Sequence, residues 1–231
     1  MSPFGSAQDR RESEQRLTLV IGNKNYSSWS LRPWLAMKQT GIPLVEQRIA
    51  LYQPDSRRRV LEHSPSGKVP VLKDGATTVW DSLAILEYLA EVFPDRGLWP
   101  QNAAARASAR SMSAEMHSGF TALRARMPMN LRNSYPGRGL TPEVEADIAR
   151  IVRLWTECRA TASGPFLFGH FCIADAMFAP VATRFVTYGV KLPPACQRYV
   201  ETLIALPALQ LWYADARAER EALEEYDRMY S

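Results

Sequence analysis

Two adjacent hydroxyl side chains are the first residues in the chain whose type and position suit chemistry. Ser27 and Ser28 stand between a strand-like run at 17–21 and a helical pattern that follows. Pro33 favours Ser30 as the helix cap, because Pro33 then stands third in the helix, where no intrahelical N–H bond is lost. The Ser27 and Ser28 hydroxyls then either donate to an anion such as a thiolate at the positive helix end, or form a plain polar turn.

A proline and an acidic residue further along supply two more motifs. Pro70 falls at the start of a predicted strand, where its missing N–H is tolerated. A cis Val69-Pro70 bond would present the Val69 N–H and C=O to a peptide-like ligand, whereas an edge-strand proline without a ligand is the alternative. Asp81-Ser82 precedes a helical pattern, so this pair either caps that helix or also binds the amine and carboxylate of a ligand.

The elements that must position these motifs alternate in type along the first part of the chain. Four strands are predicted, at 17–21, 44–50, 69–72 and 77–80, with a hairpin turn at 73–76. Helical periodicity covers 31–40 and 83–93. The order β-α-β-loop-β-β-α predicts an α/β domain over 17–96, and the polar, aperiodic segment 1–16 is expected to be a disordered tail.

Strand signals vanish after about residue 97, which predicts an all-helical second domain over 97–231 with helices at 142–160 and about 173–188. An apolar stripe at helical spacing is typical of core packing and consists of Met112, Met116, Phe120, Leu123 and Met127. The adjacent polar face either lines a cleft against the first domain or is solvated, and it carries Ser113, His117, Thr121 and Arg124.

Composition excludes several classes of protein. The 231 residues carry 28 Lys+Arg and 24 Asp+Glu, a net charge of +4 spread among acidic residues, so neither nucleic acid nor membrane is an expected partner. Three cysteines without CxxC spacing encode neither a disulfide framework nor a metal cluster, so no metal is expected. The N-terminus lacks the apolar stretch of a signal peptide, so a cytoplasmic location is expected.

Four motifs in register make the sequence similar to the cytosolic glutathione transferase superfamily from residue 17 onward. They are Ser27-Ser28 followed by Arg32, the Val69-Pro70 bend, Asp81-Ser82 before a helix, and Phe168-Gly169-His170-Phe171-Cys172-Ile173-Ala174-Asp175. The last resembles the capping box and hydrophobic staple that open the buried central helix of that family, where Asp175 accepts from the cap backbone. Cys172 departs from the usual Ser or Thr at the cap, so we predict that Cys172→Ser stabilises the protein.

The resemblance implies a thioredoxin-like first domain that binds reduced glutathione as co-substrate, an all-α bundle behind it, and a homodimer. Ser28 is then the residue that donates to the glutathione sulfur and lowers the thiol pKa, with Ser27 as the runner-up. Val69, before Pro70, would pair with the cysteinyl unit, Asp81 and Ser82 would hold the γ-glutamyl group, and Lys68 would meet the glycyl carboxylate. The partner substrate is a small electrophile. Candidate residues for its cleft, which would suit a flat apolar substrate, are Trp29, Trp34, His117, Phe120 and Arg124, and core packing is the alternative for each of them.

Several activities stay open within the resemblance. Tyrosine-type enzymes carry their tyrosine earlier relative to the helix than Tyr26, so serine is favoured. The absence of cysteine from the first domain argues against disulfide reduction and against the maleylacetoacetate isomerase branch with its Ser-Ser-Cys-Ser signature. A glutathione-dependent dehalogenase, ether-cleaving enzyme or isomerase would share the same site, and a non-catalytic interaction module would keep only the fold.

Overall fold

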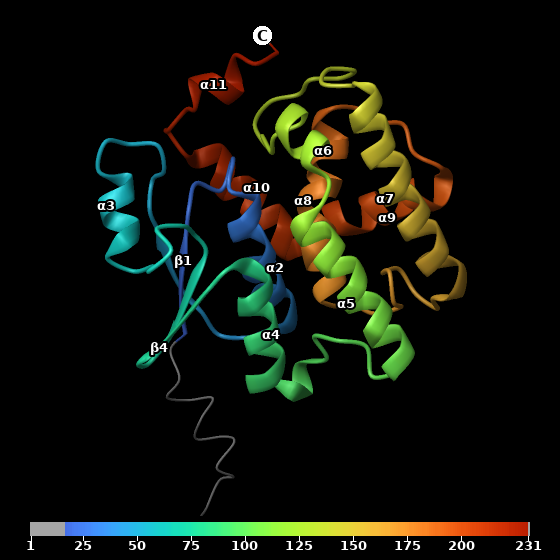
Figure 1. Ribbon diagram of the computed structural model, residues 1–231, viewed down its shortest axis with the longest axis horizontal. Coiled ribbons are helices and arrows are strands. Elements are labelled where there is room, and N and C mark those ends of the chain that lie inside the picture. The colour runs from blue at the N-terminus through green and yellow to red at the C-terminus, as the bar shows by residue number, and fades with distance from the viewer. Residues whose placement is uncertain (1–16, 231) are drawn as a thin grey trace, which may run out of the picture.

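The computed structural model describes residues 17–230, so the tail expected at 1–16 lies outside the described residues. The first half forms one mixed sheet with the strand order β2-β1-β3-β4 (Figure 1). Strand β1 pairs parallel with β2 and antiparallel with β3, which pairs antiparallel with β4. The strands span Thr18–Ile21 (β1), Val45–Arg48 (β2), Val71–Asp74 (β3) and Thr77–Trp80 (β4).

Helices cover both faces of this sheet because alternate side chains of β1 point to opposite sides. Leu19 and Ile21 belong to the main core, together with residues of α2 (Ser28–Thr40) and α4 (Ser82–Val92). Val20 instead packs with Val60 of α3 (Ser56–Leu61) in a second, smaller cluster. Figure 1 shows α3 on the outer side of the sheet and α2 with α4 on the side of the helical half.

The sequence prediction misses α3 and misplaces two boundaries. The sequence predicts a loop at 56–61, because the run there is mostly polar and has no amphipathic pattern. In the structure its one buried apolar residue is Val60. Helix α2 begins at Ser28 rather than after Ser30, and β3 begins after Pro70 rather than at Val69. Pro33 therefore lies inside α2, at its sixth position.

Described residues after η1 (Pro94–Arg96) contain helices and two isolated bridges. The helices are α5 (Ala103–Ser118), α6 (Thr121–Arg126), α7 (Pro142–Thr161), α8 (Ile173–Thr187), α9 (Pro194–Ile204), α10 (Pro207–Ala218) and α11 (Glu224–Asp227). Helix α8 is buried along nearly its whole length, and the expected capping box is present: Asp175 accepts from the Cys172 N–H at 2.9 Å. Within residues 17–230, no helix has both the length and the apolar character needed to cross a membrane.

The apolar stripe predicted over 112–127 is core, but it runs over two helices rather than one. All five of its side chains are buried. The break between α5 and α6 falls at Gly119-Phe120, where Phe120 adopts a positive φ of 58° that β-carbon sterics disfavour. The break redirects α6, and α6 carries Arg124.

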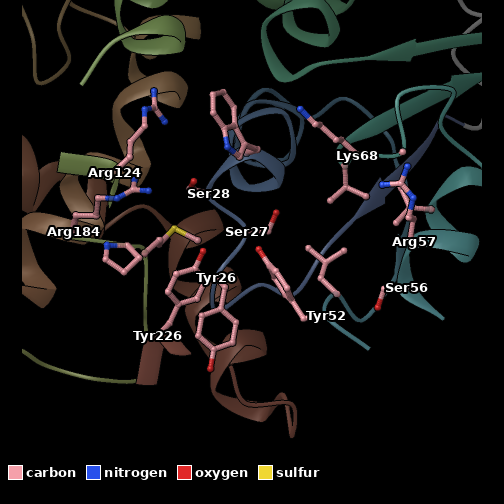
Figure 2. Close-up of a pocket in the computed structure, with 17 residues that line it drawn as sticks. Tyr26, Ser27, Ser28, Tyr52, Ser56, Arg57, Lys68, Arg124, Arg184 and Tyr226 are labelled. Atoms are coloured by element: carbon pink, nitrogen blue, oxygen red, sulfur yellow. The ribbon is translucent and has the colours of Figure 1, made fainter. Parts of the chain in front are cut away.

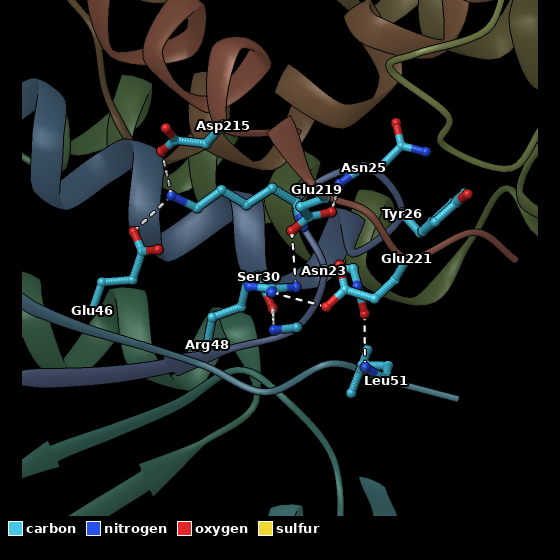
Figure 3. A network of polar contacts seen from close by, with 12 residues as sticks. Asn23, Asn25, Tyr26, Ser30, Glu46, Arg48, Leu51, Asp215, Glu219 and Glu221 are labelled. Atoms are coloured by element: carbon cyan, nitrogen blue, oxygen red, sulfur yellow. Dashed lines mark hydrogen bonds and ion pairs between the residues drawn. The ribbon is translucent and has the colours of Figure 1, made fainter. Parts of the chain in front are cut away.

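A buried lysine joins the two halves of the protein (Figure 3). The Lys24 ammonium is 2.8 Å from Glu46 of β2 and 2.6 Å from Asp215 of α10. The same ammonium lies over the rings of Trp34 and Trp212, at 4.9 and 5.2 Å from their centroids. Since Lys24 belongs to the loop before α2, this junction holds that loop in place.

Candidate active site

A cavity of about 500 Å³ opens where the start of α2 meets the helical half. Three groups of residues line it: the loop and first turn of α2, the segment between β2 and β3, and side chains from the helical half. They are Tyr26, Ser27, Ser28, Trp29, Leu51, Tyr52, Ser56, Arg57, Val60, Gly67, Lys68, Val69, Arg124, Pro128, Met129, Arg184 and Tyr226. Ser27, Ser28, Lys68 and Val69, all predicted site residues, meet at this cavity.

The loop that carries the two serines is fixed by hydrogen bonds to segments far away in sequence. The backbone N–H groups of Lys24 and Asn25 donate to the two carboxylate oxygens of Glu219 at 2.6 and 3.1 Å (Figure 3). The Asn25 side-chain oxygen accepts from the backbone N–H groups of Leu131 and Arg132 at 2.8 and 2.9 Å. Two separate segments of the helical half, one between α6 and α7 and one after α10, therefore position the start of α2.

The structure gives the two serines different roles. Ser27, not Ser30, is the N-cap of α2: its hydroxyl accepts from the Ser30 N–H at 3.4 Å and donates to the Ser30 hydroxyl at 2.8 Å. The Ser30 hydroxyl in turn accepts from the Gly22 N–H at 3.1 Å. Ser28 is the first residue of α2, and no hydrogen bond among the described residues uses its hydroxyl, which faces the cavity (Figure 2).

The Val69-Pro70 peptide bond is cis. Val69 is half-buried and lines the cavity beside Lys68, while the Pro70 side chain is buried outside it. Lys68 and Arg57 lie together on one side of the cavity in Figure 2, with Ser27 between them and Ser28. This side of the cavity therefore offers two exposed cations near the Val69 backbone.

Asp81 and Ser82 lie outside the cavity lining and connect to it through Trp29. The Trp29 ring packs edge-on against His117 at 5.2 Å and under the Arg32 guanidinium at 4.2 Å. His117 Nε2 is 3.3 Å from an Asp81 carboxylate oxygen, and Arg32 donates to the Ser82 hydroxyl at 3.3 Å.

Asp81 has a positive φ of 76° and caps α4, accepting from the Leu83 N–H at 2.9 Å and the Ala84 N–H at 3.3 Å. The cap uses one carboxylate oxygen, and the other faces His117. Burial lowers the pKa of His117, and the Arg32 and Arg124 charges lower it further against the opposing effect of Asp81. His117 is therefore neutral at pH 7 and does not form an ion pair with Asp81.

Two of the residues predicted for the substrate cleft are placed elsewhere. Trp34 is buried on the other side of α2, where it packs against Trp212 and donates to Glu46. Phe120 is in the core at the α5–α6 break and does not line the cavity. Helical spacing alone could not tell which face of α2 meets the cavity, because α2 is buried on nearly all sides. Trp29 and Arg124 line the cavity, and His117 touches Trp29 from outside it.

Tyr26 lines the cavity, but its hydroxyl is already engaged. It donates to Asp227 at 2.7 Å and accepts from Arg132 at 2.7 Å and from the Leu223 N–H at 3.1 Å. Burial raises the pKa of Tyr26. A phenol with these partners ties the C-terminal segment to the α2 loop.

The segment 219–227, together with Tyr52, Arg57 and Arg184, completes the site in ways that sequence reasoning missed. Tyr226 contacts the rings of Tyr26 and Tyr52 and lines the cavity. Glu221 pairs with Arg48 at 2.9 Å (Figure 3). The only available signal for this segment was a Tyr within a charged C-terminal stretch, which predicts no contact with a loop some 200 positions earlier.

Comparisons with known proteins agree with this arrangement. Residues 26–92 match the glutathione S-transferase N-terminal domain, and residues 114–215 match the glutathione S-transferase C-terminal domain. The chain is therefore a member of the glutathione transferase superfamily, with the thioredoxin-like and all-helical halves of that family.

The sequence identity to individual relatives is low. The chain is 27% identical over 203 residues to a probable maleylacetoacetate isomerase of Caenorhabditis elegans, covering 85% of this chain and 92% of that protein. It is also 27% identical to maleylacetoacetate isomerase of Rattus norvegicus, covering 80% and 86%. A solved glutathione transferase homolog from Burkholderia GL BGR1, with bound glutathione, aligns with a TM-score of 0.69 and 26% identity over 88% of this chain and 100% of that one. These similarities support a glutathione-dependent enzyme and leave its particular reaction to be established.

Proposed function

We propose that the protein is a glutathione transferase in which Ser28 stabilises the thiolate of bound glutathione for attack on a small electrophile. The observation that carries this proposal is the Ser28 hydroxyl, which faces the cavity at the first turn of α2 without a partner among the described residues. The neighbouring Ser27 hydroxyl is occupied by capping. Ser28 is thus the serine that is free to donate.

In the proposed reaction the thiol proton leaves to solvent and the sulfur remains as a thiolate. A hydrogen bond from Ser28 and the positive end of α2 both favour the charged form, so the thiol pKa falls below its usual value of about 8.5. In a substitution, the sulfur forms a bond to an electrophilic carbon as the bond to the leaving group breaks. The leaving group departs with that electron pair.

The remaining predicted contacts belong to the same proposal. The Val69 backbone would hold the cysteinyl unit, and Lys68, now with Arg57 beside it, would meet the glycyl carboxylate. Asp81 and Ser82 would hold the γ-glutamyl group on the other side of Trp29, where the free Asp81 oxygen is directed toward neutral His117. We also propose a homodimer in the cytoplasm, as the family resemblance implies.

A glutathione-dependent isomerase is a second candidate, favoured by the two relatives named maleylacetoacetate isomerase that align over most of their length. There the thiolate adds to a carbon–carbon double bond and is expelled again after rotation. The site needs the same Ser28, so the two reactions differ in the fate of glutathione.

Calorimetric titration with reduced glutathione and with S-hexylglutathione tests the proposal before any substrate is chosen. Saturable binding of one ligand per subunit supports it, and absence of binding at millimolar ligand would favour a non-catalytic interaction module. Counting thiols during turnover then separates the two reactions: a transferase consumes one glutathione per product, whereas an isomerase leaves the thiol concentration unchanged.

A further inference from the structure

Two arginines stand on the wall of the cavity opposite Lys68 and Arg57. Arg184 comes from the middle of the buried helix α8 and is 4% exposed, and Arg124 comes from α6. In Figure 2 both lie on the side of Ser28 away from Lys68, and the Arg184 guanidinium is directed toward Ser28. Both line the cavity.

Neither arginine is neutralised by a carboxylate contact within residues 17–230. Among the described residues, Arg184 donates to the carbonyls of Met127 at 2.8 Å and Pro180 at 3.1 Å. Arg124 donates to the carbonyls of Gly119 and Met116, and its buried Nη1 has no partner in the range 17–230.

Other charged groups near Arg184 and Arg124 do not neutralise their positive charge. Arg32, fully buried nearby, adds a third positive charge, and its Nε and Nη2 have no hydrogen-bond partner in the described part of the chain. Asp147 and Asp81 act on Arg124 and Arg32 only through longer-range attraction. Burial, together with the Arg124 charge, lowers the pKa of Arg184 to about 9, so Arg184 is still charged at pH 7. Buried charge without a counter-ion is costly, and a bound anion would remove that cost.

We infer that Arg184 and Arg124 form a subsite for a carboxylate on the electrophilic substrate, so that the enzyme prefers acidic electrophiles to neutral ones of the same shape. The inference rests on the proposed function, because Ser28 fixes where the sulfur lies. The two carboxylates of glutathione are assigned elsewhere, to Lys68 and to the region of Asp81 and Ser82. The arginine pair beside Ser28 is therefore available to bind the second substrate. This differs from the cleft for a flat apolar substrate that the sequence predicts.

Two glutathione conjugates test this without turnover: S-benzylglutathione and S-(4-carboxybenzyl)glutathione, which differ by one carboxylate on the ring. Calorimetric titration of the full-length protein should give a dissociation constant at least about tenfold lower for the carboxylate form, the gain typical of hydrogen bonds to charged groups. Arg184→Met should abolish this preference and leave binding of S-benzylglutathione within about twofold of the wild-type value.

Arg126→Met is the matched control, since Arg126 lies on α6 close to Arg124 but is exposed. It should retain the full preference for the carboxylate. Should Arg184→Met fail to fold, the ratio of the two dissociation constants in the wild-type protein still decides, and Arg124→Met supplies a second variant.

The outcomes are distinct. Equal affinity of the wild-type protein for the two conjugates would overturn the inference while leaving the glutathione site intact. Equal weakening of both conjugates by Arg184→Met would also overturn it, because the arginine would then hold glutathione itself. Binding of neither conjugate would refute the proposed function, and the inference with it.

Discussion

Replacing Ser28 by alanine isolates a single hydrogen bond, because the Ser28 hydroxyl has no partner among residues 17–230 and caps nothing. A hydrogen bond to a charged group contributes about 1.5–3 kcal/mol, and one pKa unit corresponds to about 1.4 kcal/mol. Ser28→Ala should therefore raise the pKa of bound glutathione by about one to two units. The positive end of α2 remains, so part of the pKa depression should persist.

The assay is the ultraviolet absorbance of the thiolate, followed as a function of pH with the protein saturated in glutathione. Because the pKa of the variant stays below about 8.5, at least about 3% of the bound glutathione remains thiolate at pH 7, so turnover should fall with the thiolate fraction by up to about 30-fold, while the dissociation constant of glutathione changes little. Ser27→Ala is the matched control: it removes the N-cap and should cost about 1 kcal/mol of stability without a comparable pKa shift. A thiolate pKa that moves in Ser27→Ala and not in Ser28→Ala would refute the assignment.

Three further substitutions test residues near the site or in its support. Asp81→Asn keeps an oxygen for the cap of α4 but removes the negative charge. Glutathione should therefore bind about tenfold more weakly, at similar thermal stability. If calorimetry gave an unchanged dissociation constant, Asp81 would be a helix cap only. Cys172→Ser places a better acceptor at the N-cap of α8 and should stabilise by about 1 kcal/mol, raising the melting midpoint by about 2–4 °C; an unchanged or lower midpoint contradicts this. Burial lowers the pKa of His117, so the unfolded chain takes up that proton at a higher pH than the folded protein, and stability declines as the pH falls from about 6.5 through the folded pKa. His117→Gln should flatten that decline in urea titrations at several pH values, and an identical pH profile would argue against it.

The elements that the sequence predicted well are those with strong local signals. The hairpin strand at 77–80, the buried helix at 173–187 and its capping box depend on turn residues, periodicity and a cap within a few positions. Helix α3 gave no such signal, because a single residue, Val60, attaches it to the sheet. Assigning Ser30 as the cap failed for a different reason: the helix accommodates Pro33 in its interior, so the proline did not mark its start.

Part of the candidate site could be predicted from the sequence. Ser28 and Val69 stand next to recognisable turns or helix starts, so their positions follow from local pattern. Arg184 and Tyr226 reach the cavity only through packing between distant segments, and on sequence alone they are an interior helix residue and a tail residue. Trp34 shows the converse error, because an aromatic residue close to the serines points away from them toward Trp212.

The attachment of segment 219–227 to the α2 loop has a consequence for how the protein opens. Glu219 holds the backbone of Lys24 and Asn25, and Asp227 holds the hydroxyl of Tyr26, immediately before Ser27 and Ser28. Release of this segment therefore removes part of the restraints on the serine loop at the same moment as it exposes peptide bonds to a protease, while the contacts of Asn25 with Leu131 and Arg132 remain. Proteolytic clipping near residue 220 would then report directly on the assembly of the site, and a ligand seated against Tyr226 would slow that clipping in proportion to its occupancy.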